Sequence, residues 1–298
     1  MVSVIIVTHN NQRFLKDCLN SVFGQTYKDI EAILVFNASL PSAIQDVRIS
    51  FPRLNLIIND ENLLFCRASN QGIDKSQGEY ALCLNDDVIL ESDFVEALVE
   101  AASADKKIGM VSGKILRMDK VTLDSTGLFL GKSRIPLERG FNRKDWGQYN
   151  GEEYVFGVSG CAALYRRIML EDIKDQYGYF DERFGIFYED LDLSWRANKK
   201  GWKGYYVPRA IAYHQRGATV KIGRPALNFF RKYNFSYLSD ELKVRLIKNR
   251  YMTIRKSDSF RGFIFHLPFI LLYEIRIYLY LLFFSPRLLV KLAQSKDG

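Results

Sequence analysis

The chain has 298 residues, of which 48% are hydrophobic and 26% charged, a composition that excludes disordered and fibrous proteins and allows a large core with an appendage. The formal net charge of +8 is unevenly distributed, because residues 1–220 carry −2 and the segment from Lys221 to the C-terminus carries +10. A near-neutral domain followed by a strongly basic tail predicts that the tail contacts an anionic surface.

Strand and helix signals alternate over the first 115 residues. Short β-branched or aliphatic runs predict strands at 2–7, 30–36, 54–59, 80–84 and 108–115. Helical spacing of apolar residues predicts helices at 14–23, 65–75 and 93–104. Ser92 is the expected N-cap of the third helix. This alternation is typical of an α/β fold in which helices cover both faces of a mostly parallel sheet.

The N-terminus and the cysteines both favour a cytoplasmic protein. The first apolar run follows Met1 directly and has neither a cationic flank nor a small-residue cleavage site, so it predicts a strand rather than a signal peptide. The four cysteines lie far apart, within apolar patterns and without a CxxC pair. This spacing argues against a disulfide framework and against a zinc site.

Polar residues follow three of the predicted strands. In a parallel sheet the loops after the strands gather at one rim, where ligands bind. The residues that we expect to meet there are Thr8, His9 and Asn10, then Asn37 and Ser39, and finally Asn85, Asp86 and Asp87.

Two adjacent carboxylates, Asp86 and Asp87, end the fourth predicted strand. Like charges repel each other unless a positive charge lies beside them. A magnesium or manganese ion is the simplest candidate, because hard oxygen ligands suit these cations. The alternative interpretation is a solvated acidic turn that caps the next helix.

A second acidic cluster occurs at the start of a later helical stretch, which contains Glu189, Asp190 and Asp192. Carboxylates in a first helical turn are also favoured by the helix dipole alone. Gly201 ends the helix, and two strand-like runs then lead to His214. A histidine in this position is either a metal ligand or a packed, hydrogen-bonded residue.

Taken in order, these segments resemble the family 2 glycosyltransferases of the GT-A fold and, within them, the bacterial rhamnosyltransferase-like branch. The resemblance covers about residues 1–217. It rests on VSVIIVTHNNQRFLKDCLNSVFGQTY, ASNQGIDKSQGEYALCLNDDV, GVSGCAALYRR and GYFDERFGIFYEDLDLSWRANKKGWKGYYVPRAIAYH. It implies a glycosyltransferase domain at 1–220, followed by a basic, apolar helical region at 221–298.

The resemblance also implies roles for individual residues. Asp87 and His214 are the expected ligands of a divalent metal, Mn²⁺ or Mg²⁺. Asp190 is the expected general base of a single displacement that inverts the anomeric configuration. The remaining positions fall into two sets. Those expected to bind the nucleotide-sugar donor are Thr8, Asn10, Asn37, Asn70, Asn85, Asp86 and Gly160. Those expected to orient the acceptor or the base are Glu189 and Asp192.

One departure from the family pattern concerns the donor. Phe36 stands where the family usually has an aspartate that contacts the nucleobase. A phenyl ring cannot accept a hydrogen bond, so Phe36 either stacks on a base or fills the core. Arg67 replaces a small residue and either contacts the diphosphate or lies on the surface. By resemblance we expect a dTDP- or UDP-sugar donor, with dTDP-rhamnose favoured.

Two further segments concern the acceptor and the membrane. Residues 117–154 hold few regular signals, and long segments of this kind often bind substrate. The apolar run 263–284 is long enough to span a bilayer, but it contains Pro268, Glu274 and Arg276. With its basic flanks and aromatics, it favours helices that lie on an anionic membrane surface. The alternative is a helical appendage packed on the domain or in a homodimer.

We therefore expect a cytoplasmic enzyme associated peripherally with the inner face of the cell membrane. Its expected acceptor is a glycan or a polyprenyl-diphosphate-linked sugar. Nucleic-acid binding is not expected, because no groove-reading motif accompanies the basic tail. The rival functions are a sugar-nucleotide-binding pseudoenzyme and a nucleotidyltransferase of related fold.

Overall fold

The computed structural model describes residues 1–9, 12–216 and 238–294. Asn10, predicted above as a donor-binding residue, lies outside the described residues. The chain divides into two compact units. Unit 1 contains Met1–Phe129 and Leu137–Gln215, and unit 2 contains Leu130–Pro136 and Arg216–Gly298.

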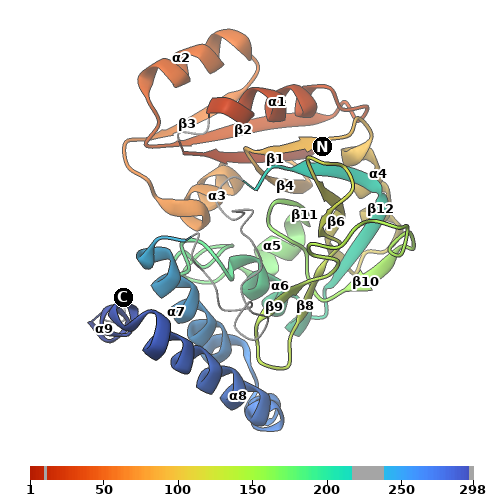
Figure 1. The fold of residues 1–298 in the computed structure, drawn as a ribbon. Coiled ribbons are helices and arrows are strands. Elements are labelled where there is room, and N and C mark those ends of the chain that lie inside the picture. The colour runs from red at the N-terminus through yellow and green to blue at the C-terminus, as the bar shows by residue number, and fades with distance from the viewer. Residues whose placement is uncertain (10–11, 217–237, 295–298) are drawn as a thin grey trace. The chain divides into compact units, whose positions relative to one another are not determined.

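Unit 1 is built on a ten-stranded sheet, shown in Figure 1. Its main path runs, in spatial order, through β10 (Glu153–Val155), β12 (Lys203–His214), β6 (Ile108–Arg117), β11 (Ala162–Arg166), β4 (Tyr80–Asn85), β1 (Val2–Thr8), β2 (Ile30–Asn37) and β3 (Asn55–Asn59). Two short strands lie off this path, β5 (Val88–Leu90) on β12 and β7 (Leu123–Ser125) on β6. A separate two-stranded sheet is formed by β8 (Leu128–Leu130) and β9 (Pro136–Glu138).

The strand directions confirm the predicted, mostly parallel sheet. Strand β1 is parallel to β2 and to β4, β2 is parallel to β3, and β6 is parallel to β12. Strand β11 is antiparallel to both β4 and β6. The central strands consist almost entirely of buried aliphatic residues, as expected for strands covered on both faces.

The helices of unit 1 are α1 (Gln12–Phe23), α2 (Pro41–Ser50), α3 (Leu64–Lys75), α4 (Phe94–Ala104), α5 (Arg167–Ile173) and α6 (Glu189–Lys199). The prediction of Ser92 as the N-cap of α4 is wrong, because Asp93 occupies that position and no side chain caps the helix. Helix α2 was not predicted, since it buries only Ala43 fully and so shows little amphipathic pattern. Proline in its first turn is compatible with a helix start.

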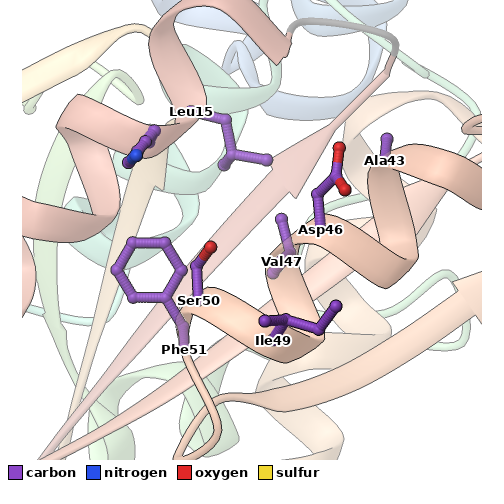
Figure 2. A pocket seen from close by; sticks show the side chains of 8 residues that line it. Leu15, Ala43, Asp46, Val47, Ile49, Ser50 and Phe51 are labelled. Carbon is purple, nitrogen blue, oxygen red and sulfur yellow. The ribbon is translucent and has the colours of Figure 1, made fainter.

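A pocket of about 420 Å³ lies between α1 and α2, as Figure 2 shows. The residues that line it are Leu15, Lys16, Ala43, Asp46, Val47, Ile49, Ser50 and Phe51. None of the residues predicted for the donor or metal site is among them. The pocket therefore belongs to the helical layer and not to the rim formed by the strand ends.

Unit 2 contains the helices α7 (Asp240–Ser257), α8 (Phe260–Phe284) and α9 (Pro286–Gln294). Ser239 and Ser259 cap α7 and α8, each accepting a hydrogen bond from a backbone N–H three residues later. The buried apolar residues of this unit that pack together are Ile247, Ile277, Leu281 and Leu288. Among the described helices, α8 alone has the length and apolar composition to cross a membrane.

Two buried arginines hold the segment Leu130–Pro136 in unit 2. Arg134 pairs with Asp258 at the end of α7, with Nε 2.6 Å from Oδ2. Arg250 donates to the carbonyl of Ser133 and pairs with Glu274 of α8. Glu274, which lies in the middle of the apolar run, is therefore neutralised by a neighbouring helix.

Candidate active site

The strand directions gather the predicted residues at one rim of the sheet. Strands β1, β2, β4 and β12 all end there, because β4 and β12 lie in the same direction on either side of the antiparallel β11 and the parallel β6. Since β11 runs the other way, the residues that precede it, Gly160 and Cys161, reach the same rim. The backbone N–H of Asn85 donates to the carbonyl of Cys161, which joins the ends of β4 and β11.

Asp87 and His214 lie against each other. Strand β5 pairs with the end of β12, with Val88 opposite His214, and this register places Asp87 beside the imidazole. Asp87 Oδ1 lies 3.2 Å from His214 Nε2. The two predicted metal ligands are thus neighbours, although 127 positions separate them in the sequence. A carboxylate and an imidazole together suit Mn²⁺.

Two further residues complete this cluster, and the sequence analysis missed both. Ligand atoms of Asp124, Cys161 and His214 all lie within 4.8 Å of one another, and all three side chains are buried. Asp124 Oδ2 is 2.8 Å from His214 Nδ1. Asp124 lies in the segment with few regular signals, and no motif marks it. Cys161 stands next to Gly160 in a motif that drew attention only to the glycine.

The electrostatics of His214 reflect its two acidic neighbours. Burial by itself would lower the pKa of His214, but hydrogen bonds to Asp124 and Asp87 outweigh it and raise the pKa well above its usual value. The carboxylates of the cluster therefore favour a positive charge near the imidazole. Either a protonated His214 or a cation shared by His214 and Asp87 would supply it.

Thr8, Asp86 and Asn85 lie next to this cluster. The hydroxyl of Thr8, buried at the end of β1, donates to Asp86 Oδ2 over 2.7 Å. The thiol of Cys18 donates to the carbonyl of Asn85 over 3.5 Å. Asp86 is therefore tied to the protein, whereas Asp87 faces His214. The two adjacent carboxylates point to different partners, which lowers their mutual repulsion.

Asp190 lies at the N-terminus of α6, where its carboxylate accepts two backbone hydrogen bonds. Leu191 N–H donates to Oδ1 over 2.7 Å, and Gly160 N–H donates to Oδ2 over 3.3 Å. A Cβ added to Gly160 would meet Asp190 at 3.7 Å and Glu189 at 3.9 Å, which is ordinary van der Waals contact. The protein itself does not require glycine at this position, so any requirement for it would come from a ligand.

Glu189 lies beside Asp190 and is held in a different electrostatic state. Burial and then the neighbouring Asp190 raise the pKa of Glu189 to about 8. Its Oε2 atom is buried and has no hydrogen-bond partner among the described residues. The two residues that precede it, Phe187 and Tyr188, both have φ of 71°, in the left-handed region. Strained backbone of this kind is often found at functional sites.

The dipeptide Gly160–Cys161 joins the two acidic clusters. Gly160 contacts Asp190 through its N–H, and Cys161 belongs to the cluster around His214. A ligand lying over this dipeptide would have the carboxylate of Asp190 on one side and the cluster around His214 on the other.

Two residues predicted to bind the donor, Asn37 and Asn70, are engaged within the protein. Asn37 is 1% exposed, and its amide bonds the side chains of Asn59 and Asn62 and the backbone of the following loop. Asn70 makes both hydrogen bonds that the backbone of Phe180 offers, at 2.8 and 2.9 Å. These contacts fix loops near the rim. The donor-binding roles of Asn37 and Asn70 stay predictions.

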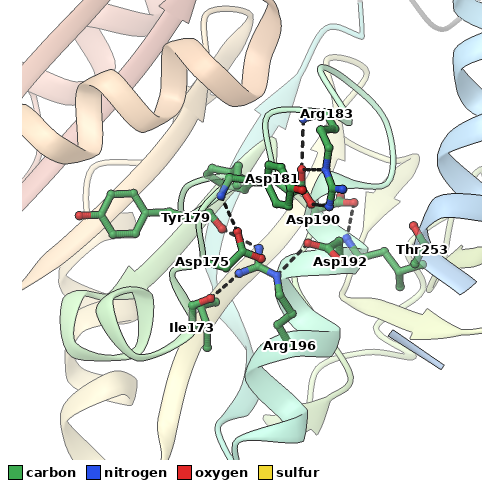
Figure 3. Close-up of polar contacts among 12 residues, drawn as sticks. Ile173, Asp175, Tyr179, Asp181, Arg183, Asp190, Asp192, Arg196 and Thr253 are labelled. Atoms are coloured by element: carbon green, nitrogen blue, oxygen red, sulfur yellow. Dashed lines mark hydrogen bonds and ion pairs between the residues drawn. The ribbon is translucent and has the colours of Figure 1, made fainter. Parts of the chain in front are cut away.

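Asp192 is fully buried and pairs with Arg196, as Figure 3 shows. Nε of Arg196 lies 2.8 Å from Asp192 Oδ2, and the other guanidinium nitrogens donate to the carbonyls of Ile173 and Tyr179. This arrangement ties the loop before α6 to the helix. The role of Asp192 in orienting the acceptor or the base stays a prediction.

Burial distinguishes the two departures from the family pattern. Phe36 is 1% exposed and belongs to the main apolar core, so it cannot stack on a nucleobase. The side chain of Arg67 is 57% exposed and lies 3.9 Å from Glu182. Of the alternatives left open by the sequence, the core role of Phe36 is the one observed. Arg67 lies on the surface, and its contact with a diphosphate stays a prediction.

Comparison with known proteins identifies the family. The profile of "Glycosyl transferase family 2" matches residues 3–174, which is more than half of the chain. The chain belongs to glycosyl transferase family 2. This family 2 glycosyltransferase is 26% identical over 263 residues to the N-acetylglucosaminyl-diphospho-decaprenol L-rhamnosyltransferase of Mycobacterium tuberculosis, covering 80% of this chain and 84% of the relative.

Solved structures confirm the GT-A fold. GalNAc-T7 with UDP, GalNAc and Mn²⁺ superposes with a TM-score of 0.59 at 15% identity, covering 86% of this glycosyltransferase and 57% of that chain. The mannosyltransferase PcManGT from Pyrobaculum calidifontis, in complex with GDP-Man and Mn²⁺, gives 0.57 at 18% identity, covering 98% and 72%. The glycosyltransferase thus spans just over half the length of the first of these structures.

Proposed function

We propose that this glycosyltransferase moves a sugar from a nucleoside diphosphate sugar to a hydroxyl group of an acceptor, with inversion at the anomeric carbon. One observation carries the proposal: the carboxylate of Asp190 and the Asp87–His214 pair lie on either side of the dipeptide Gly160–Cys161. A single displacement needs a base next to the acceptor and a charge-stabilising group next to the leaving diphosphate, and this arrangement supplies places for both.

Asp87 and His214 are the residues that would hold a divalent cation, Mn²⁺ or Mg²⁺. The fit is supported by the short approach of a carboxylate oxygen to an imidazole nitrogen, 3.2 Å, which places two ligand atoms of suitable chemistry side by side. Bound there, the cation would stabilise the negative charge of the departing diphosphate. The solved structures with Mn²⁺ and nucleotides support the same view.

Asp190 is suited to act as the base. Two backbone N–H groups stabilise its carboxylate and fix its orientation. Glu189 beside it has a pKa of about 8 and so carries the proton near neutral pH. Asp190 then takes the proton of the acceptor hydroxyl as the oxygen bonds to the anomeric carbon and the bond to the diphosphate breaks.

The acceptor is proposed to be a lipid-linked glycan in cell-surface polysaccharide synthesis. The name of the mycobacterial relative specifies a lipid-linked diphosphate acceptor and transfer of L-rhamnose. By that relationship we infer a dTDP- or UDP-sugar donor, with rhamnose as the first sugar to test. Because Phe36 is buried, other residues must contact the nucleobase.

Unit 2 is proposed to hold the enzyme on the inner face of the cell membrane. The outward side chains of α8 are large and apolar, among them Phe265 at 76% and Phe283 at 71% exposed. Such a helix beside basic residues favours binding in the plane of an anionic membrane surface. The apolar face would also serve a homodimer, which a measurement of mass in solution distinguishes.

The function is tested by a panel of dTDP-, UDP- and GDP-sugars with and without Mn²⁺. Binding is read by thermal shift, and transfer or slow donor hydrolysis is read by release of the nucleoside diphosphate. Asp190→Asn is expected to reduce transfer by at least about 10²-fold, the usual share of a general base, while donor binding is kept.

The matched control is Asp17→Asn, an exposed aspartate on α1, for which unchanged turnover is expected. Wild-type turnover in Asp190→Asn would rule out Asp190 as the base. Binding of every donor without any transfer or hydrolysis would favour a sugar-nucleotide-binding pseudoenzyme. Transfer of a nucleotidyl group would favour a nucleotidyltransferase.

A further inference from the structure

Asp124 contacts the ring nitrogen of His214 that Asp87 does not. The Nδ1 atom of the imidazole lies 2.8 Å from Asp124 Oδ2, and Nε2 lies 3.2 Å from Asp87 Oδ1. The side chain of Asp124 is fully buried, whereas that of Asp87 is 11% exposed. The imidazole therefore joins a carboxylate inside the protein to one at the rim.

A register shift in the sheet places the carboxylate of Asp124 beside the imidazole of His214. Strand β7 pairs with β6, and β6 pairs with β12, where His214 stands opposite Arg117. The pairing of β6 with β7 shifts register between Ile115 and Leu116, at the position that faces Asp124. Bulges next to functional sites commonly redirect a side chain, and here the shift allows Asp124 to reach past β6 to the histidine on β12.

The chemistry of the contact fixes the tautomer. An ionised carboxylate only accepts hydrogen bonds, so Nδ1 must carry a hydrogen when it faces Asp124. The other carboxylate oxygen, Oδ1, lies 3.6 Å from Arg117 Nε. In the form of His214 that can bind a cation, which carries no proton on Nε2, the lone pair is on Nε2 and directed at Asp87. Two electron-rich atoms 3.2 Å apart require a proton or a cation between them.

We propose that Asp124 is a positioning residue that holds the ring of His214 with Nδ1 protonated and Nε2 directed at a divalent cation shared with Asp87. This rests on the metal site of the proposed function and adds to it a residue that neither the sequence motifs nor the family pattern indicated. Carboxylates that orient a metal-bound histidine commonly raise metal affinity, because they fix the ring and increase its basicity.

The first test is the affinity of the full chain for Mn²⁺, measured by the electron paramagnetic resonance signal of the free ion. Asp124→Asn keeps the shape of the side chain but removes its charge and allows the amide to face Nδ1 as a donor. We expect the dissociation constant for Mn²⁺ to rise about 10- to 100-fold. The matched control is Asp181→Asn, another fully buried aspartate paired with an arginine, for which Mn²⁺ affinity should not change.

A double-mutant cycle tests whether Asp124 acts through His214. In the background His214→Ala, the change Asp124→Asn should add no further loss of Mn²⁺ affinity. An equal loss in both backgrounds, or no loss in either, would overturn the positioning role while leaving the proposed function intact.

A second measurement does not depend on the folding of a variant. The chain has three histidines, so ¹⁵N resonances of the imidazoles can be assigned by replacing His9 and His266. In the Mg²⁺-saturated enzyme, Nδ1 of His214 is expected to carry the proton. A proton on Nε2 under these conditions would overturn the inference. Transfer that persists in EDTA, together with no Mn²⁺ binding, would instead remove the metal from the proposed function and the inference with it.

Discussion

Glu189 and Asp190 are adjacent carboxyl groups that the fold treats differently. Asp190 receives two backbone hydrogen bonds, whereas Oε2 of Glu189 is buried without a partner. Burial therefore favours the protonated form of Glu189, whose pKa rises to about 8. A protonated Glu189 avoids two negative charges in contact.

Replacing Glu189 tests this difference through stability. The pKa of Glu189 is about 8 in the folded chain and near 4.5 when unfolded, so between these values only the folded chain keeps the proton. Its contribution to stability is therefore fully present below about pH 4.5 and is lost as pH rises towards 8. The free energy of unfolding should fall by up to about 1.4 kcal/mol per pH unit from this group. Glu189→Gln should lack this slope.

The measurement is urea unfolding of both chains at pH 5.5, 7 and 8.5. Glu189→Gln should gain stability relative to the unaltered chain as pH rises. Glu61→Gln, at an exposed position in a loop, is the control and should follow the unaltered chain throughout. Parallel curves for Glu189→Gln and the unaltered chain would show that Glu189 is not protonated in the folded state.

At the residue scale, the sequence indicated the residues that lie in motifs, but it did not indicate the residues that hold them in position. Asp87, Asp190 and His214 were singled out because each follows a recognisable element in a recognisable order. Asp124 was missed because its role comes from a register shift between β6 and β7, which no local pattern encodes. Residues that act through long-range contacts leave little trace in a single sequence.

At the scale of elements, α6 is positioned by contacts that come from other parts of the sheet and loops. Asn70 on α3 holds the backbone of Phe180, and Arg196 holds the carbonyls of Ile173 and Tyr179. The loop before α6 is thereby held at its start and in its middle, which can support the strained residues directly before Glu189. We therefore expect the stability of this loop and the position of Asp190 to be coupled.

Asn70→Ala should weaken this coupling. It leaves the buried N–H and carbonyl of Phe180 without partners, at a cost of about 1–3 kcal/mol for each group. We expect a lower free energy of unfolding in urea, together with a lower kcat. Asn20→Ala, on the exposed side of α1, is the control. Unchanged stability and kcat in Asn70→Ala would contradict a supporting role for this contact.

Elements were predicted where buried apolar residues recur at a regular spacing along the sequence, and were missed where they do not. Strands β1 to β4 and β6 and helices α1, α3 and α4 were predicted from apolar spacing, whereas the central strand β11 was not. Helix α2 and the three-residue strands β7 to β10 were not, because α2 buries few residues and each of these strands is too short to show a periodic pattern. Short strands depend on their partners for their conformation, so sequence alone carries little information about them.

At the scale of the whole molecule, the chain has two kinds of surface. Residues 1–220 are nearly neutral, whereas the C-terminal segment is strongly basic and exposes large apolar side chains on α8. The assignment of Leu130–Pro136 to unit 2 was not predictable, because it depends on Arg134 and Arg250 reaching residues far along the chain. The pairing of Arg250 with Glu274 also changes how the apolar run is interpreted. It removes one charge that would oppose contact with lipid, while the other charges and Pro268 still oppose a simple span.

Membrane binding follows from this surface and is tested by flotation of the full chain with vesicles that contain anionic lipids. Binding is expected, with partial release at high salt because part of the attraction is electrostatic. Replacing Phe265 and Phe283 together by Glu removes two exposed aromatic rings, each contributing about 1.5–3 kcal/mol when buried, so binding should fall at least tenfold. Ile168→Glu, which changes an exposed apolar residue of α5 in unit 1, should leave binding unchanged. Retention in membranes after both salt and alkaline washes would indicate a spanning helix, and no binding to vesicles would favour burial of this face in a dimer.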